Sequence, residues 1–191
     1  DLSDYATGVL QQLQRERARS ASFLASNGQR FSQELQQQQA LTDQQLSALN
    51  RYLSSSNKLE FGQAFANTWQ ALLDDLAQLA EKRSAITSMQ LSTQQAIDFY
   101  SQLNAKLIAA TQILTQIGAS AEISNIAAAY THALYASENA GMERAILNAA
   151  FSSDTLSFDS LRTLLSLMAQ QALNTKQFID RANPEQKRFI E

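Results

Sequence analysis

The sequence of 191 residues has no cysteine, one proline, one histidine and five glycines. Without cysteine the chain forms no disulfide, no thiolate metal site and no cysteine nucleophile. A β-sandwich or barrel of this length needs frequent glycine and proline at its turns, so their scarcity argues against an all-β fold. Ala, Leu, Gln and Ser predominate instead, a composition that favours long helices joined at few corners.

The sequence also lacks a strong charge of one sign and a long apolar run. Its 15 Lys and Arg against 18 Asp and Glu give a net charge of −3, so no basic field is present to attract nucleic acid. No apolar run approaches the roughly 18 residues that a membrane span needs, and no signal peptide is visible. Because Asp1 already lies inside a helical pattern, we expect residues 1–191 to be a single domain taken from a longer protein.

The few corner signals divide the chain into long helices. Asn27-Gly28, Ser54–Asn57, Gly118–Ser120, Phe151–Asp159 and Asn183-Pro184 are typical of helix ends and loops. Six helices result, at about 2–27, 29–54, 58–90, 93–117, 120–150 and 159–182. Such long rods are stable only when an apolar stripe is buried against neighbours. The sequence therefore predicts an all-α, elongated antiparallel bundle with both termini at one end and no sheet.

Two further segments have the spacing of a helix-initiating capping box, in which a short polar side chain and a Gln three residues later bond each other's backbone. Ser92-Thr93-Gln94-Gln95 fits the start of the fourth helix, and Thr42-Asp43-Gln44-Gln45 predicts that the second helix breaks or restarts there.

The first helix carries a charged pair on its apolar side. Its stripe consists of Leu2, Tyr5, Val9, Leu13, Phe23 and Leu24. At about 100° per residue, Glu16, Arg17 and Ser20 fall within about 50° of the centre of this stripe. Arg15 and Arg19 fall more than about 100° away. Of the three arginines in this segment, only Arg17 is predicted to face the core.

The fifth helix shows a second inward arginine. Its stripe runs through Ile123, Ile126, Ala127, Tyr130, Leu134, Ser137, Gly141 and Asn148. Arg144 projects about 40° from the centre of this stripe, whereas Glu143 points largely outward. Gly141, one turn before Arg144, removes a side chain from that face and opens space there.

An inward arginine cannot lose its charge, so it needs an anion or several hydrogen-bond acceptors. One interpretation is an internal ion pair of Arg17 or Arg144 with Glu16, Glu138 or Asp98. The other is that both arginines converge on one small external anion, whose planar oxygens match the guanidinium fork. Periodicity alone leaves both interpretations open.

Five segments carry a resemblance to known proteins. They are Gln14–Ser26, Thr42-Asp43, Leu79–Ile86, Phe99-Tyr100 and Glu138–Ala145. The first and the last resemble the two signatures of the nitrate- and nitrite-sensing (NIT) domain, and the other three fall between them in the order of that family. The resemblance spans most of the chain.

The resemblance implies a fold and a ligand site. NIT domains are all-α, with long helices forming two stacked four-helix-bundle-like halves, and they sense nitrate or nitrite in bacterial chemoreceptors, sensor kinases and transcription antiterminators. Their anion is held between one arginine of each signature, which correspond here to Arg17 and Arg144. With Ser20 and Gly141 from the same inward faces, these residues form the predicted ligand site.

The resemblance also implies a setting for the domain. We expect a periplasmic or extracytoplasmic sensor domain of an inner-membrane chemotaxis receptor, homodimeric, anchored by flanking spans and signalling by helix rearrangement. Its partner is expected to be a small anion, and no nucleic acid. Two alternatives remain: a sensor for another small anion, such as a carboxylate or an amino acid, and a purely structural helical module in which both arginines are internally paired.

No segment predicts an enzyme, a cofactor or a metal site. His132, the single histidine, projects about 160° from the centre of the fifth stripe, so we expect it at the surface. A di-iron bundle needs Glu-x-x-His pairs, and the sequence has none.

Overall fold

The computed structural model describes residues 2–54, 62–116 and 121–188, and within these ranges every regular element is helical. The helices are α1 (Leu2–Ala25), α2 (Ser32–Ser54), α3 (Gly62–Leu76), α4 (Leu79–Thr87), α5 (Thr93–Gln116), α6 (Ala121–Ser153), α7 (Phe158–Arg181) and α8 (Pro184–Lys187). The predicted all-α class is confirmed.

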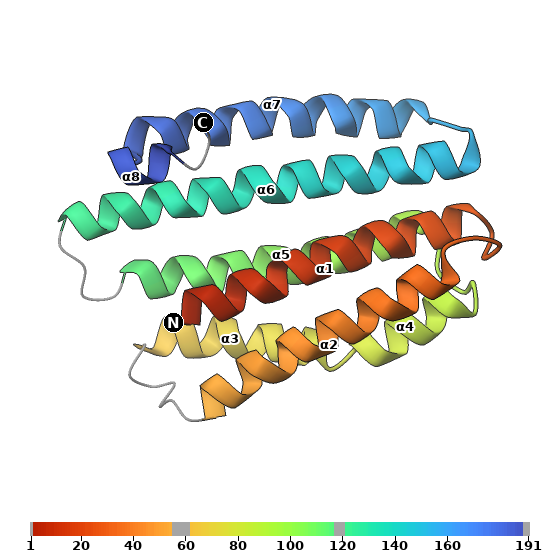
Figure 1. Cartoon of the computed structure of the whole chain (residues 1–191), viewed down its shortest axis with the longest axis horizontal. Helices are drawn as coiled ribbons and strands as arrows, with labels where there is room; N and C mark the ends of the chain where they lie inside the picture. Colours follow the sequence, from red (N-terminus) through yellow and green to blue (C-terminus); the bar gives the residue numbers. More distant parts are fainter. Residues whose placement is uncertain (1, 55–61, 117–120, 189–191) are drawn as a thin grey trace.

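The helices form an elongated bundle with α1 and α5 at its centre (Figure 1). On one side of this pair lie α2, α3 and α4, and on the other lies α6, which carries α7 on its outer face. The helices are therefore stacked in layers, with α7 on α6, α6 on the central pair, and α2 and α3 on its other side. The predicted two four-helix halves are not both present in this form, because α7 packs on α6 and not on α1 or α5. α1 begins and α7 ends at the same end of the molecule (Figure 1), as the alternation of long helices predicted.

The predicted third helix, 58–90, is wrong as a single element. It is divided into α3 and α4 by a turn at Ala77-Gln78, where the Gln78 amide bonds the carbonyl of Asp75. Neither glycine nor proline marks this turn, and Gln78 offers no side-chain cap to α4. The local sequence therefore gives no signal of the break, which depends on packing.

The two capping-box predictions have opposite outcomes. At Ser92 the box is present, since the Ser92 hydroxyl accepts from the Gln95 amide and the Gln95 side chain accepts from the Ser92 amide. The predicted break at Thr42 is wrong. Thr42 is buried in the middle of an uninterrupted α2, where its hydroxyl donates to the carbonyl of Gln38. A hydroxyl satisfied by its own helix in this way does not end the helix.

The turn between α1 and α2 follows the predicted stop at Asn27-Gly28. Both residues have left-handed backbone (φ 51° and 72°), and Gly28 donates to the carbonyl of Phe23. This closes α1 as a glycine C-cap does. Phe31, with φ 70°, immediately precedes α2. The predicted corner at Gly118–Ser120 lies outside the described residues.

Candidate functional site

The arginine-rich segment of α1 divides its side chains between core and surface. Arg17 is fully buried, with 0% of its surface exposed, whereas Arg15 and Arg19 are exposed. Successive helical residues are rotated by about 100°, so the residues two positions before and after Arg17 point away from it. The predicted division of these three arginines is confirmed.

Arg17 is paired with a carboxylate of α6. Its Nη1 and Nη2 donate to Oε1 and Oε2 of Glu138, the second at 3.3 Å, and Nη1 also donates to the Ser101 hydroxyl of α5 at 2.8 Å. This two-pronged geometry is the strong form of an arginine–carboxylate pair. The internal ion pair that the sequence left open is therefore present for Arg17.

Glu138 and the space around it are arranged for this pair. Its Oε2 also accepts from Gln14 at 2.9 Å and from Asn104 at 3.0 Å. Gly141 lies against Arg17, whose Nη2 would be only 2.8 Å from a Cβ at that position. The absence of a side chain at Gly141 is thus what lets the guanidinium reach Glu138, and the space predicted there is filled by Arg17.

Some buried polar atoms around the pair of Arg17 and Glu138 make no hydrogen bond. Nε of Arg17 and Oδ1 of Asn104 are buried and have no hydrogen-bond partner among the residues that the structure describes. Buried polar atoms are normally satisfied, so each exception needs an explanation. Arg17 has a donor to spare for a further acceptor. Ser20 is buried as predicted.

Glu16, adjacent to Arg17, is held by a different set of helices. Arg83 of α4 donates to both of its oxygens, at 2.7 and 2.9 Å, and the Tyr100 hydroxyl of α5 donates to Oε1 at 2.7 Å. Arg83 also reaches Asp43 of α2 at 2.7 Å. Sequence reasoning turned Glu16 inward but missed Arg83, because nothing in the local sequence marks a pair between residues 67 positions apart.

The pKa values of both groups that contact Glu16, Arg83 and Tyr100, are raised. Burial disfavours the charged form of Arg83, but its bonds to Glu16 and Asp43 outweigh this and raise its pKa. Burial and the neighbouring Glu16 carboxylate together raise the pKa of Tyr100 well above its usual range. Tyr100 is therefore a fixed hydrogen-bond donor, and Arg83 a fixed cation.

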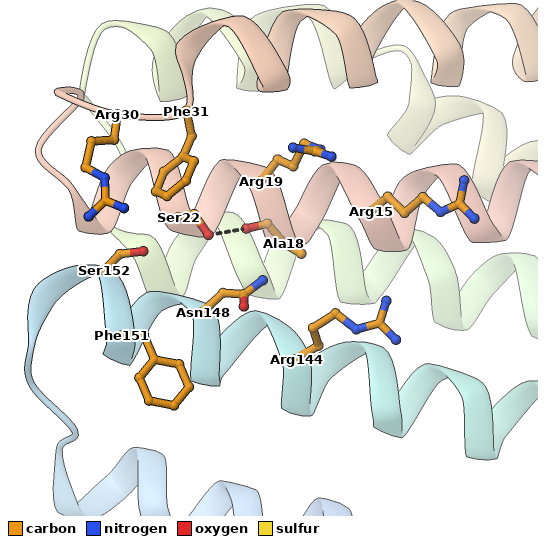
Figure 2. Close-up of a pocket in the computed structure, with 10 residues that line it drawn as sticks. All are labelled: Arg15, Ala18, Arg19, Ser22, Arg30, Phe31, Arg144, Asn148, Phe151 and Ser152. Atoms are coloured by element: carbon orange, nitrogen blue, oxygen red, sulfur yellow. Dashed lines mark hydrogen bonds between the residues drawn. The ribbon is translucent and has the colours of Figure 1, made fainter.

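An arginine-lined groove opens along the line where α1 meets α6 (Figure 2). Arg17 and Glu138 do not line it, although Ala18, the neighbour of Arg17, does. Its volume is about 390 Å³. The lining contains Arg15 and Arg19 of α1, Arg144 of α6 and Arg30 of the turn after α1, together with the polar side chains Ser22, Asn148 and Ser152 and the rings of Phe31 and Phe151. No carboxylate lines this groove, so it favours anions.

Arg144 lies in this groove and not in the core. The predicted inward orientation is wrong, because Arg144 is exposed. α6 packs against α1 and α5 and also against α7, so the centre of a single stripe does not determine which of its residues are covered, and the long side chain of Arg144 reaches solvent. No carboxylate of the described ranges forms an ion pair with it. Arg144 follows Gly141 by three residues, or about 4.5 Å along α6. Arg17 is therefore buried at the α1–α6 contact while Arg144 lies in the groove, and the structure does not bring the two side chains into one cavity.

A model of the nitrate and nitrite sensing family matches residues 8–191. The chain belongs to the NIT family. No curated protein sequence matches the chain. Among solved structures, the NasR transcription antiterminator is similar to this NIT domain, with a TM-score of 0.89 and 22% sequence identity over 97% of the chain. The chain covers 50% of the length of NasR. At this identity the likeness shows a shared fold.

Other kinds of site find no support in the described part of this NIT domain. It contains no group of three His, Asp or Glu side chains placed to hold a metal ion. Its described helices include none long and apolar enough to cross a membrane. His132, predicted at the surface, is half-buried, and its Nδ1 lies 3.0 Å from Oδ1 of Asn174.

Proposed function

We propose that this NIT domain is a sensor that binds nitrate or nitrite at the α1–α6 interface, with Arg17 and Arg144 as the principal ligands and Ser20 and Gly141 shaping the site. One observation carries the proposal. The fully buried Arg17 already holds a planar oxyanion, the Glu138 carboxylate, and the same α1–α6 interface carries a groove with four arginines and no acid. Nitrate has the same planar arrangement of oxygens. The role is binding and not catalysis.

Glu138 is the internal competitor of the ligand. Because the pair between Arg17 and Glu138 fills the space next to Gly141, an anion that reaches Arg17 must displace the Glu138 carboxylate from it. Arg144 in the groove then supplies the second guanidinium. Arg144 and Glu138 are both residues of α6, so the exchange changes how α6 is held against α1.

This exchange gives the ligand a way to signal. A ligand shifts a conformational equilibrium only if it binds one arrangement better than the other. Arg17 holds α6 to α1 through Glu138 in the absence of an anion, and through the bound anion and Arg144 in its presence. The two arrangements place α6 at different positions along α1, and a shift of this long helix is the proposed output.

Calorimetric titration with nitrate tests the proposal. We expect Arg144→Ala to weaken binding by at least tenfold, since a hydrogen bond to a charged group contributes about 1.5–3 kcal/mol. Glu138→Gln is expected to strengthen binding, because it removes the charge of the competitor and keeps the side chain. Arg162→Ala, which removes an exposed arginine of α7, is the control and should bind as the parent does.

Two results would contradict the nitrate site. The first is equal affinity in the Arg144→Ala and Arg162→Ala variants. The second is the absence of any nitrate-specific rise in melting temperature, because a ligand that binds only the native state adds about 2.7 kcal/mol at a hundredfold excess over its Kd. Without that rise, the pair of Arg17 and Glu138 is a structural ion pair and the domain a structural module.

A small carboxylate is the second candidate ligand. It is favoured by the chemistry of Glu138 itself, because the group that Arg17 holds is a carboxylate. Titrations with nitrate, nitrite, formate and acetate at matched salt separate the two candidates. Preference for the carboxylates would reassign the ligand and leave the site unchanged.

For the host protein we propose an inner-membrane chemotaxis receptor in which this domain is extracytoplasmic, dimeric and anchored by spans on both sides. The proposal is supported by the position of the two ends of the domain, since α1 begins and α7 ends at the same end of the molecule (Figure 1). A domain inserted between two membrane spans needs both connections on one side. Membrane fractionation of the full-length protein tests this, and recovery in the soluble fraction would favour a host like NasR.

A further inference from the structure

One flank of α7, beside α6, presents an apolar seam that no other helix of the described chain covers. It consists of Phe158, Leu161, Leu165, Met168, Ala172, Thr175 and Ile179. α7 packs on α6 through a different row, which includes the buried Leu164, Leu167 and Phe178. In Figure 1, α7 is the outermost layer of the molecule. This set of seven residues is called the α7 seam below.

The seam is too exposed and too regular to be ordinary surface. Phe158, Leu165 and Met168 are 74%, 59% and 53% exposed. The residues alternate at spacings of three and four over three heptads, the pattern of a helix that packs lengthwise on another helix. Soluble proteins rarely leave large contiguous apolar patches open unless these bind something.

The two halves of the seam have complementary shapes. The first half carries large side chains, among them Leu161, Leu165 and Met168, whereas Ala172 and Thr175 in the second half are small. Over those small residues lies a hollow of about 530 Å³ between α7 and Glu143 of α6. Interdigitating packing sets large side chains against small ones.

We propose that the α7 seam is a dimer interface in which two copies of this chain pair their α7 helices antiparallel about a two-fold axis near Gln170. In this register Met168 packs against Ala172 of the second copy and Leu165 against Thr175, so the large half of each seam fills the hollow of the other. Such an interface is self-complementary, as a two-fold axis requires. A parallel pair would set Ala172 against itself and leave the hollow unfilled.

Charge is consistent with a second copy as the occupant. Asp159 pairs with Arg162 and Lys176 with Asp180 beside the seam, and Glu143 of α6 and Lys176 border the hollow with opposite charges. Two copies therefore bring both signs of charge to the contact although each chain has a net charge of −3. The seam runs along the 24 residues of α7, a length of about 36 Å.

Sedimentation equilibrium of the 191-residue chain gives the first test. We expect twice the 21.1 kDa of one chain, and a dimer dissociation constant weakened at least tenfold by Leu165→Glu. Gln170→Glu adds the same charge on α7 outside the seam and should leave the dimer intact. A monomer at all concentrations, or a dimer that resists a folded Leu165→Glu variant, would overturn the proposal. Met168→Lys serves the same purpose if Leu165→Glu fails to fold.

Disulfide trapping tests the register of the two α7 helices. Because the sequence has no cysteine, only the introduced cysteines can form a cross-link. Ala169→Cys should cross-link to its own copy on oxidation. Leu161→Cys should not, because its own copy lies about 27 Å away in the antiparallel register. Leu161→Cys mixed with Ile179→Cys should cross-link. Self-cross-linking of Leu161→Cys would show a parallel pair, and no cross-link in any combination would show that α7 is not the interface.

Discussion

At the scale of single residues, Glu16 and Arg17 are adjacent, oppositely charged and both fully buried. They do not neutralise each other, because neighbouring positions diverge around a helix. Each is paired with a residue of another helix, Glu16 with Arg83 of α4 and Arg17 with Glu138 of α6. Removal of one partner of a buried pair leaves an uncompensated charge and costs about 3–5 kcal/mol. The two positions are therefore intolerant of change for separate reasons.

Gly141→Ala should lower the stability of the domain. In an ordinary helix interior this change stabilises by about 0.5–1 kcal/mol. Here the new Cβ would stand 2.8 Å from Nη2 of Arg17 and force the guanidinium away from Glu138, at a cost of about 1–3 kcal/mol. Thermal denaturation shows whether Gly141→Ala lowers or raises the melting temperature. Ser137→Ala, an exposed change on the same helix, is the control, and a higher melting temperature for Gly141→Ala would contradict the packing described here.

Tyr100 should make the domain sensitive to alkali. Because the pKa of Tyr100 is raised in the folded state, its contribution to stability is complete below the unfolded tyrosine pKa of about 10 and is lost as pH rises above it. Urea unfolding from about pH 8 to about pH 11 should show a fall in stability that is smaller in Tyr100→Phe. Tyr135→Phe, a half-buried control, should keep the full fall.

The sequence predicted the candidate site in part. Arg17 was identifiable because it lies within the apolar stripe of α1 and its neighbours at 15 and 19 do not. The inward prediction for Arg144 is wrong, since α6 has neighbours on more than one side and one stripe centre does not determine which of its residues are covered. Arg83 was missed entirely, because its partners lie on helices distant in the sequence.

At the scale of helices, ends are determined by local chemistry where short polar side chains cap them. The boxes at Ser92–Gln95 and at Asn183–Gln186 satisfy amides that a helix leaves unpaired. The start at Ser92 was therefore predictable. The break between α3 and α4 was not, since it has no cap, glycine or proline. The box at Thr42 was misleading, because the same spacing occurs inside α2.

Ser92→Ala should destabilise the domain by about 1 kcal/mol, because it leaves the Gln95 amide without its cap. Gln95→Ala should cost less, and the double variant should cost less than the sum of the two single changes, since the two bonds are reciprocal. Urea denaturation of the parent, the two single variants and the double variant gives the coupling free energy between Ser92 and Gln95. Thr42→Ala is not expected to shift any helix boundary, and circular dichroism should show unchanged helix content.

At the scale of the whole molecule, two buried ionic nodes, one around Glu16 and one around Arg17, connect α1 to different neighbours. The node of Glu16 ties α1 to α2, α4 and α5, and the node of Arg17 ties it to α5 and α6. The two sides of the bundle are thus joined by polar contacts that converge on consecutive residues. A shift of α6 that acts on Arg17 also acts on the segment that carries Glu16.

Arg83→Ala should therefore destabilise the whole bundle by about 3–5 kcal/mol, since it leaves Glu16 charged, buried and held by Tyr100 alone. Asp43→Ala removes only the exposed partner of Arg83, since the Asp43 side chain is 57% exposed. It should lower the free energy of unfolding by at most about 1 kcal/mol. Chemical unfolding of both variants compares them. Equal losses would show that the buried part of this node contributes no more than its surface part.

The groove of Figure 2 has a kinetic consequence. Arg15, Arg19, Arg30 and Arg144 surround an opening on a chain that is otherwise acidic. The positive potential in such an opening attracts anions and raises the rate at which they encounter it. Salt weakens this attraction, because the Debye length shortens from about 30 Å at 0.01 M to about 8 Å at 0.15 M ionic strength. The association rate of an anionic ligand should thus fall steeply with added salt. At the proposed site its dissociation rate, which depends on contact with the buried Arg17, should change little. A sensor built this way responds fastest in dilute surroundings.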